Sequence, residues 1–254
     1  MKGWTADIAA SVGFLTRLPM PAELPFVPLS EAMRAFPLAG ALIGALAGVM
    51  LAALASLGLP ALAAAGLTLA ALAWLTGALH EDGLDDTADG FGGGKDRDGK
   101  LAIMRDSHIG SYGVLALILG LLVKGACLAA LAQDSWLHLV ALLAATGGFS
   151  RALIVWLMAS TPPARNDGLA HAAGQPSDFT ARSALVIGGL LALVLLLFSY
   201  GLIPALVVGS VGALAAGAMR SLAMRQIGGH TGDICGALQF VSETAMIAAA
   251  ATLS

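Results

Sequence analysis

Charged residues are scarce in this chain. Only 11% of its 254 residues are Asp, Glu, Lys or Arg, whereas 58% are hydrophobic and the mean hydropathy is +0.85. Soluble domains carry about 25% charged residues, which cover their water-facing surface. The shortage excludes an ordinary soluble domain and indicates a polytopic membrane protein.

A basic excess and cysteine clusters are also missing. The formal net charge is −3 and the isoelectric point about 5.9, whereas nucleic-acid-binding proteins carry a surplus of Lys and Arg. We therefore expect no nucleic-acid partner. Cys127 and Cys235 lie far apart and lack metal-ligand spacing, so we expect two free thiols packed in helices.

Long apolar stretches are abundant, and a membrane crossing needs about 20 apolar residues in a row. The apolar run 8–15 is too short to cross and fits an interfacial helix. The sequence thus predicts an all-α, polytopic integral membrane helical bundle with about seven transmembrane helices and an N-terminal interfacial helix, in one domain covering 1–254. The expected spans are 38–57, 59–79, 114–131, 137–157, 184–199, 203–219 and 237–253.

The basic residues are distributed unevenly around these spans. Eleven of the thirteen Lys and Arg residues fall in connections on one side, and the turns on the other side contain none. By the positive-inside rule, all the charged loops should face the cytoplasm. The other two lie within spans. Lys124 is near a span end, from which its ammonium could reach the surface. Arg151 is mid-span, where a cation usually faces a polar cavity.

One stretch, 79–90, contradicts the general avoidance of charge, with five acids in nine positions. At roughly 100° per residue on a helix, Asp82, Asp86 and Asp89 fall within about 60° of one another, while Asp85 lies at the edge of that sector and Glu81 further round. Carboxylates on one face repel each other unless a cation lies among them, and an all-oxygen set favours Mg²⁺. We therefore expect a Mg²⁺ site, with a solvated acidic loop as the plain alternative.

Basic groups accompany these acids. Eight of the sixteen acids lie between Glu81 and Asp106, together with four Lys and Arg residues. Acids for a metal and bases for phosphate in one loop suggest phosphoryl chemistry. A Gly-rich turn at 228–233, flanked by Arg225 and containing Thr231, can also offer backbone N–H donors to a phosphate.

These motifs closely resemble one family. The stretches that carry the resemblance are HEDGLDDTADG at 80–90, IMRDSHIG at 103–110, FLTRLP at 14–19, FPL at 36–38, ARNDGL at 164–169, GGHTGD at 228–233 and GA at 236–237. In this order they are similar to cobalamin synthase, the adenosylcobinamide-GDP ribazoletransferase family of vitamin B12 assembly, over essentially the whole chain. Glu81 and Asp85 depart from the family pattern, in which we expect apolar or small residues.

The resemblance implies a reaction and a set of site residues. The family joins adenosylcobinamide-GDP to α-ribazole or its 5′-phosphate at the membrane with Mg²⁺, releasing GMP and forming adenosylcobalamin or its 5′-phosphate. By this resemblance, Asp82, Asp86 and Asp89 would hold Mg²⁺. Phosphate and substrate would be bound by Arg105, Arg151, Arg165, Thr231, Asp233 and Glu243. The catalytic residues would be Asp106, Asp86 and Arg105, with Asp106 or one of the metal-binding acids taking the proton from a ribose hydroxyl.

For a bacterial member, the membrane would be the cytoplasmic (inner) membrane. The sequence leaves the oligomeric state open, and a homo-oligomer is compatible with it.

Three rival functions share parts of the acidic pattern. Asp85-Asp86-Thr87-Ala88-Asp89 spells the DDxxD motif of membrane prenyltransferases, but a second Asp-rich helix is missing. Asp86 to Gly90 matches the first half of the CDP-alcohol phosphotransferase motif, without its downstream aspartates. A divalent-cation transporter would place its acids near the bilayer midplane, away from basic residues that repel a cation.

Overall fold

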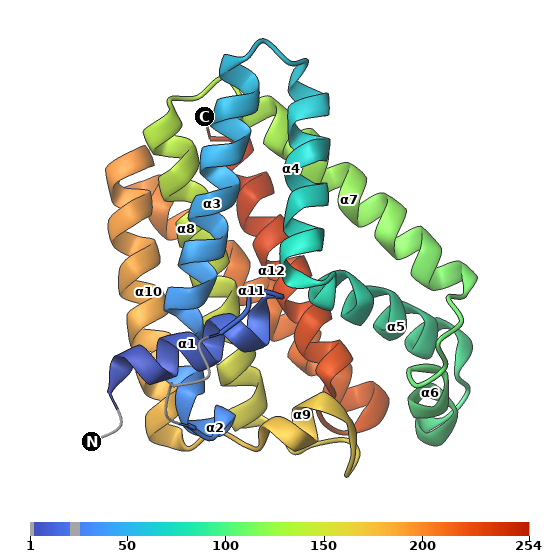
Figure 1. Cartoon of the computed structure of the whole chain (residues 1–254). Helices are drawn as coiled ribbons and strands as arrows, with labels where there is room; N and C mark the ends of the chain where they lie inside the picture. Colours follow the sequence, from blue (N-terminus) through green and yellow to red (C-terminus); the bar gives the residue numbers. More distant parts are fainter. Residues whose placement is uncertain (1–2, 21–25, 254) are drawn as a thin grey trace.

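The computed structural model describes residues 3–20 and 26–253, and these fold into α-helices joined by short connections. Among the described residues, six helices are long and apolar enough to cross a membrane, or seven if one bent pair counts as a span. The expected all-α membrane bundle is therefore confirmed (Figure 1). The helices are α1 (Trp4–Leu15), α2 (Leu29–Ala32), α3 (Phe36–Ser56), α4 (Ala61–Thr76), α5 (Leu79–Gly93), α6 (Arg97–Ile103), α7 (Ser111–Leu131), α8 (Trp136–Ser160), α9 (Gly168–Ala173), α10 (Asp178–Tyr200), α11 (Leu202–Ile227) and α12 (Gly232–Ala251).

Helix α8 is the centre of the bundle. In its most apolar window 83% of the residues are buried, against 22% for each of α7, α10 and α11, whose outer faces carry exposed Leu, Ile and Val. Glycines let α3 pack closely on α8. A Cβ at Gly40 would collide with the backbone of Gly147, and one at Gly44 with that of Leu143. The small residues spaced four apart thus serve helix packing, as is common in membranes.

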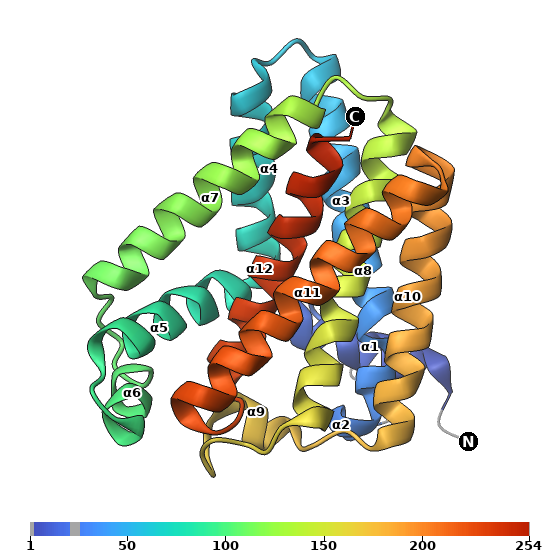
Figure 2. The ribbon, with the colours of Figure 1, turned by 180° about the vertical axis from the view of Figure 1, so that it is seen from behind.

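The expected span 59–79 is not one straight helix. Helix α4 stops at Thr76, and α5 leaves it at an angle of 92°. Gly77 and Ala78 both adopt left-handed backbone conformations, with φ of +68° and +57°, and so break the helical path. The acidic stretch consequently runs across the bundle instead of continuing along it (Figures 1 and 2).

The N-terminal helix α1 also lies crosswise, near the α4–α5 junction (Figure 1). The backbone N–H of Arg17, just after α1, donates to the carbonyl of Leu75 at 2.8 Å, which ties the two segments together. Phe14 of α1 stacks on Phe36 of α3 with ring centroids 5.9 Å apart. The short apolar helix expected in this region is therefore present and anchored on the bundle.

Candidate functional site

The acidic helix α5 meets α12 at a pair of glycines. A Cβ on Gly83 would lie 2.6 Å from the carbonyl oxygen of Asp233 and 2.9 Å from Cα of Gly236, so only glycine permits this approach. Since α12 begins at Gly232, its first turn lies directly beside the carboxylates of α5. The site is therefore built from two helices that are about 150 residues apart in sequence.

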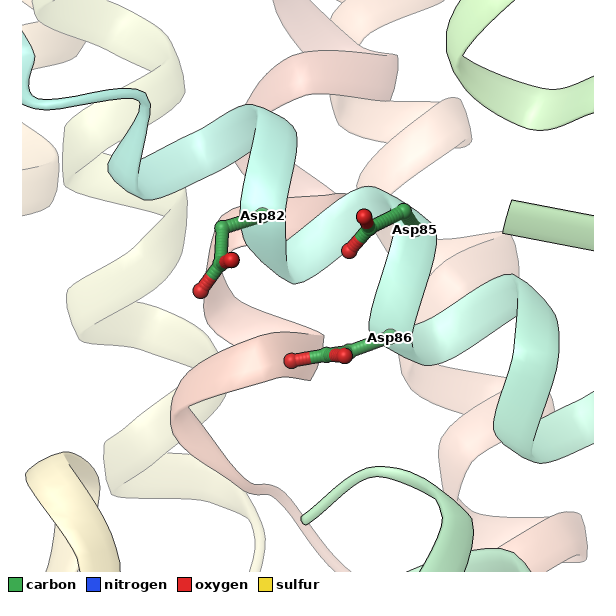
Figure 3. A group of neighbouring side chains, drawn as sticks. All are labelled: Asp82, Asp85 and Asp86. Carbon is green, nitrogen blue, oxygen red and sulfur yellow. The ribbon is translucent and has the colours of Figure 1, made fainter. Parts of the chain in front are cut away.

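Three aspartates of α5 converge. Asp82, Asp85 and Asp86 can each offer one carboxylate oxygen so that all three oxygens lie within 4.8 Å of one another. Figure 3 shows their carboxylates turned toward a common space beside α5. We call these residues the acidic trio. Carboxylates this close repel one another, so a hard divalent cation fits the all-oxygen donor set.

Asp89, expected to bind the metal ion, contacts backbone N–H groups in the structure. Its carboxylate accepts the backbone N–H of Gly110 at 2.5 Å and of Gly113 at 2.9 Å, at the start of α7. It thus satisfies N–H groups that a helix N-terminus leaves without partners and lies at the positive end of the helix dipole. The structure brings together Asp82 and Asp86 of the expected set, with Asp85 in place of Asp89.

A chain of alternating charges leads from α12 to the loops. Asp233 lies 3.4 Å from Nη2 of Arg165, and Nε of Arg165 lies 3.4 Å from Asp167. Nη2 of Arg105 donates to both oxygens of Asp167, at 2.8 and 2.7 Å. The Arg105–Asp167 pair is half exposed, whereas the Arg165 side chain is only 12% exposed. Nε and Nη1 of Arg165 are buried and have no hydrogen-bond partner among the described residues.

Arg165 is held in place by two loops that pair as in a parallel β-bridge. The N–H of Ala164 donates to the carbonyl of His230 at 2.8 Å, and the N–H of His230 donates to that of Pro162 at 2.9 Å. A ring nitrogen of His230 lies 2.9 Å from the Thr161 hydroxyl, and burial lowers the pKa of His230. A neutral His230 therefore fastens the loop that carries Arg165 to the loop that precedes α12.

Thr231 begins α12 as its N-cap. Its hydroxyl oxygen accepts the N–H of Ile234 at 3.3 Å, and the hydroxyl donates to Asp233 at 3.0 Å. This side chain, expected to bind phosphate, is fully buried and already engaged. It orients the carboxylate that faces Arg165.

Asp106 lies in the loop between α6 and α7. It accepts hydrogen bonds from the backbone N–H of His108 at 3.1 Å and pairs with the His108 ring at 2.6 Å. These hydrogen bonds lower the pKa of the Asp106 carboxyl and raise the pKa of His108. The pair is exposed to solvent, and Asp106 is not a member of the acidic trio.

Arg151 and Glu243 lie in another compartment, inside the bundle. Glu243 forms an ion pair with Lys124, and Nη1 of Arg151 lies 3.8 Å from the other oxygen of Glu243. Nη1 of Arg151 also donates to the carbonyl of Gly147 at 3.0 Å. Glu81 and His80 line the same small cavity, with Oε2 of Glu81 and Nε2 of His80 lacking partners among the described residues. Arg151 does face the polar cavity expected for it.

Two features of the structure were not predicted from the sequence. The position of Lys124 near a span end allowed it to reach the membrane surface, but it is 4% exposed and paired with Glu243 of α12 inside the bundle. Asp85 was placed at the edge of the acidic sector, yet it belongs to the trio. The only available signal was that Asp85 and Glu81 both interrupt the family pattern. Cys127 and Cys235 are free thiols, as expected.

Comparison with known proteins identifies the family. A family model described as cobalamin-5-phosphate synthase matches residues 7–251. A protein of Rhizobium etli strain CIAT 652 with the name adenosylcobinamide-GDP ribazoletransferase is 45% identical, over 99% of this chain and 98% of its own length. Proteins with the same name from Azorhizobium caulinodans and Sinorhizobium medicae are each 47% identical, over 95% and 96% of this chain and 94% and 95% of their own length. No solved structure matches significantly. The resemblance seen in the motifs is confirmed, and this chain belongs to the cobalamin-5-phosphate synthase family.

Proposed function

We propose that this membrane protein is a Mg²⁺-dependent adenosylcobinamide-GDP ribazoletransferase, acting in a late step of cobalamin biosynthesis. It would transfer the adenosylcobinamide phosphate moiety of adenosylcobinamide-GDP to α-ribazole or its 5′-phosphate and release GMP. Family membership and relatives with this name, aligned over nearly the full chain, support the activity. We further propose that residues 1–254 form one domain, which has this transferase activity.

The observation that carries this proposal is the position of the acidic trio beside a buried arginine with unused donors. A diphosphate brings negative charge, so it needs both a cation and hydrogen-bond donors. Asp82, Asp85 and Asp86 supply a donor set that fits Mg²⁺. Nε and Nη1 of Arg165 make no hydrogen bond within the described part of the chain, although Nε lies near Asp167. Mg²⁺ bound to the trio would neutralise the charge that develops on the diphosphate as GMP leaves.

Other residues of the site would bind the phosphate groups and orient one another. Nη1 of Arg165 would donate to a phosphate oxygen, and Asp233 and Asp167 would fix the plane of its guanidinium. Arg105, joined to Arg165 through Asp167, would add positive charge at the outer edge. A ribose hydroxyl oxygen of α-ribazole would form the new bond to phosphorus while the bond between phosphorus and the bridging oxygen of the diphosphate breaks.

The proton of that hydroxyl needs an acceptor. We propose Asp106, because it is a carboxylate next to Arg105 in sequence and His108 fixes its orientation. Its loop lies between Arg105 and the Gly110 N–H that binds Asp89, so it borders α5. The proton could pass from Asp106 to water, since the pair is exposed.

We also propose that the site faces the cytoplasm from the inner membrane. The eleven basic residues outside the spans support this orientation by the positive-inside rule. Nucleotide substrates are produced in the cytoplasm, which fits an active site on that side.

Transfer by the purified protein tests the proposal. The detergent-solubilised chain is incubated with adenosylcobinamide-GDP, α-ribazole and Mg²⁺, and GMP and adenosylcobalamin are measured by chromatography. We expect the two products in equal amounts, and neither after removal of divalent cations with EDTA. GMP formed at the same rate without α-ribazole would indicate hydrolysis and contradict a transferase. Activity that persists in EDTA would contradict the role of Mg²⁺.

A further inference from the structure

A pocket with apolar walls opens beside the acidic trio. It lies among α1, α3, α5, α8, α9 and the start of α12 and encloses about 600 Å³ counted to its mouth. Asp82 belongs both to the trio and to the pocket lining, so a molecule in this pocket would reach the trio directly.

The walls of the pocket are chemically selective. The stacked rings of Phe14 and Phe36 form one side, and Ile154, Met158 and Leu169 contribute aliphatic surface. Besides the Cys235 thiol, the polar side chains in the lining are those of His80, Asp82 and Asp233. Asp82 and Asp233 also belong to the site described above, so the polar groups gather on one side of an otherwise apolar space.

We propose that this pocket, which we name the base pocket, binds the flat benzimidazole-type base of α-ribazole and directs its ribose toward the acidic trio. This inference rests on the proposed transferase function and adds the position of the acceptor substrate. An aromatic bicyclic ring would continue the stack of Phe14 and Phe36. The ribose, attached to one edge of the base, would lie at the polar side, where its hydroxyl must meet the diphosphate.

Guanine, the base of the GDP moiety, suits the base pocket poorly. It carries an amide, an amino group and ring nitrogens that need hydrogen-bond partners when they are buried. The wall formed by Phe14, Phe36, Met158 and Ile154 has no side-chain donor or acceptor for them. A benzimidazole ring offers far fewer such groups, and its methyl substituents gain from burial.

Two alanines of α9 provide a matched pair of variants. Ala170 lines the base pocket and is partly exposed, whereas Ala172, two residues later on the same short helix, is exposed and outside the lining. Ala170→Phe should fill the pocket, and Ala172→Phe should add the same side chain on the outer side. We expect Ala170→Phe to raise the KM for α-ribazole at least about tenfold, while the KM for adenosylcobinamide-GDP stays within about twofold. Ala172→Phe should change neither constant.

Binding to the unmodified protein gives a second test that does not depend on the folding of a variant. The Kd of α-ribazole and of its analogue without the two methyl groups is measured by titration calorimetry without the nucleotide substrate. Each methyl group buried in an apolar pocket should improve the Kd by about fourfold. The riboside of adenine, with its polar edge, should bind more weakly than both.

The outcomes distinguish a failure of the proposed transferase function from a failure of the base-pocket inference. A wild-type protein that forms no GMP contradicts the proposed function itself. Transfer by the wild type, with Ala170→Phe indistinguishable from Ala172→Phe, contradicts only the base pocket. A rise in the KM for adenosylcobinamide-GDP instead of α-ribazole would assign the pocket to that substrate and overturn the inference. Equal Kd values for the methylated and unmethylated ribosides would also overturn the inference.

Discussion

Lys124 and Glu243 form an ion pair inside the helical bundle. The ammonium comes from α7 and the carboxylate from α12, and the two side chains are only 5% and 12% exposed. Either charge alone would be costly in a membrane interior. The pair therefore ties the outlying helix α7 to α12, which also contributes Asp233 to the proposed site.

Removing one member of this pair should destabilise the protein strongly. Lys124→Met or Glu243→Gln leaves the partner charge buried, which typically costs about 3–5 kcal/mol. We expect a clearly lower midpoint of thermal unfolding in detergent for each single variant. The double variant should recover part of the loss, although Arg151 then lacks the nearby carboxylate of Glu243. Asp98→Asn, at the exposed Arg97–Asp98 pair, is the control and should cost less than about 1 kcal/mol. A double variant as unstable as the sum of the singles would contradict the coupling.

The different positions of Asp85 and Asp89 lead to opposite expectations for metal binding. Asp85→Ala should weaken Mn²⁺ binding, measured by electron paramagnetic resonance, by more than about tenfold, because a carboxylate of the trio is lost. Asp89→Ala should change that affinity less but lower the thermal midpoint, since the cap at Gly110 and Gly113 is lost. The reverse order of effects would restore Asp89 as a metal ligand and remove Asp85.

Arg165 and Arg105 should respond differently to Lys substitution. Arg165→Lys should lower kcat by about 10²-fold, because an ammonium cannot keep the ion pairs to Asp167 and Asp233 and also reproduce the planar guanidinium donor to the diphosphate. Arg105→Lys should lower kcat only a few-fold, because the ammonium of Lys can keep the exposed ion pair with Asp167. Steady-state kinetics of both variants, after thermal melting has shown that they are folded, provides the check. A larger loss at Arg105 would make that residue the phosphate clamp.

Gly83 should be intolerant of a side chain for steric reasons. Gly83→Ala places a methyl group against the backbone of Asp233 and Gly236, and such overpacking typically costs about 1–3 kcal/mol. It should also reduce transfer, because α5 and Asp233 are pushed apart. Gly66→Ala is the control, since in the described part of the chain no atom outside its own helical turns lies within 4 Å of a Cβ at that position. Equal unfolding midpoints for the two variants would show that α5 can move aside freely.

The orientation in the membrane can be tested with single cysteines in a background in which Cys127 and Cys235 are replaced by Ala. Cysteines at Asp96 and Gln175, both exposed, should react with an impermeant thiol reagent only when the cytoplasmic side is accessible. A cysteine at Gln133, exposed in the turn between α7 and α8, should react from the opposite side. Labelling of the Asp96→Cys variant in intact cells would contradict the proposed topology.

The sequence by itself determined the parts of this protein that depend on local composition. Apolar runs of about 20 residues defined the spanning helices, because hydrocarbon excludes charge wherever the neighbouring helices lie. Spacing along the chain was also enough to recognise the acidic helix and to place Asp82 and Asp86 on one face of it. The motifs were specific enough to identify the family.

Only the tertiary structure decided what depends on distant segments. The bend at Gly77 and Ala78 turns α5 across the bundle, and an apolar stretch of sequence gives no sign of it. Angles on an ideal helix grouped Asp89 with Asp82 and Asp86, but the N–H groups of α7 bind Asp89 and leave Asp85 to complete the trio. Lys124 forms an ion pair with Glu243, and Arg165 forms one with Asp233. Such contacts between distant segments depend on how the helices cross and not on their spacing in the chain.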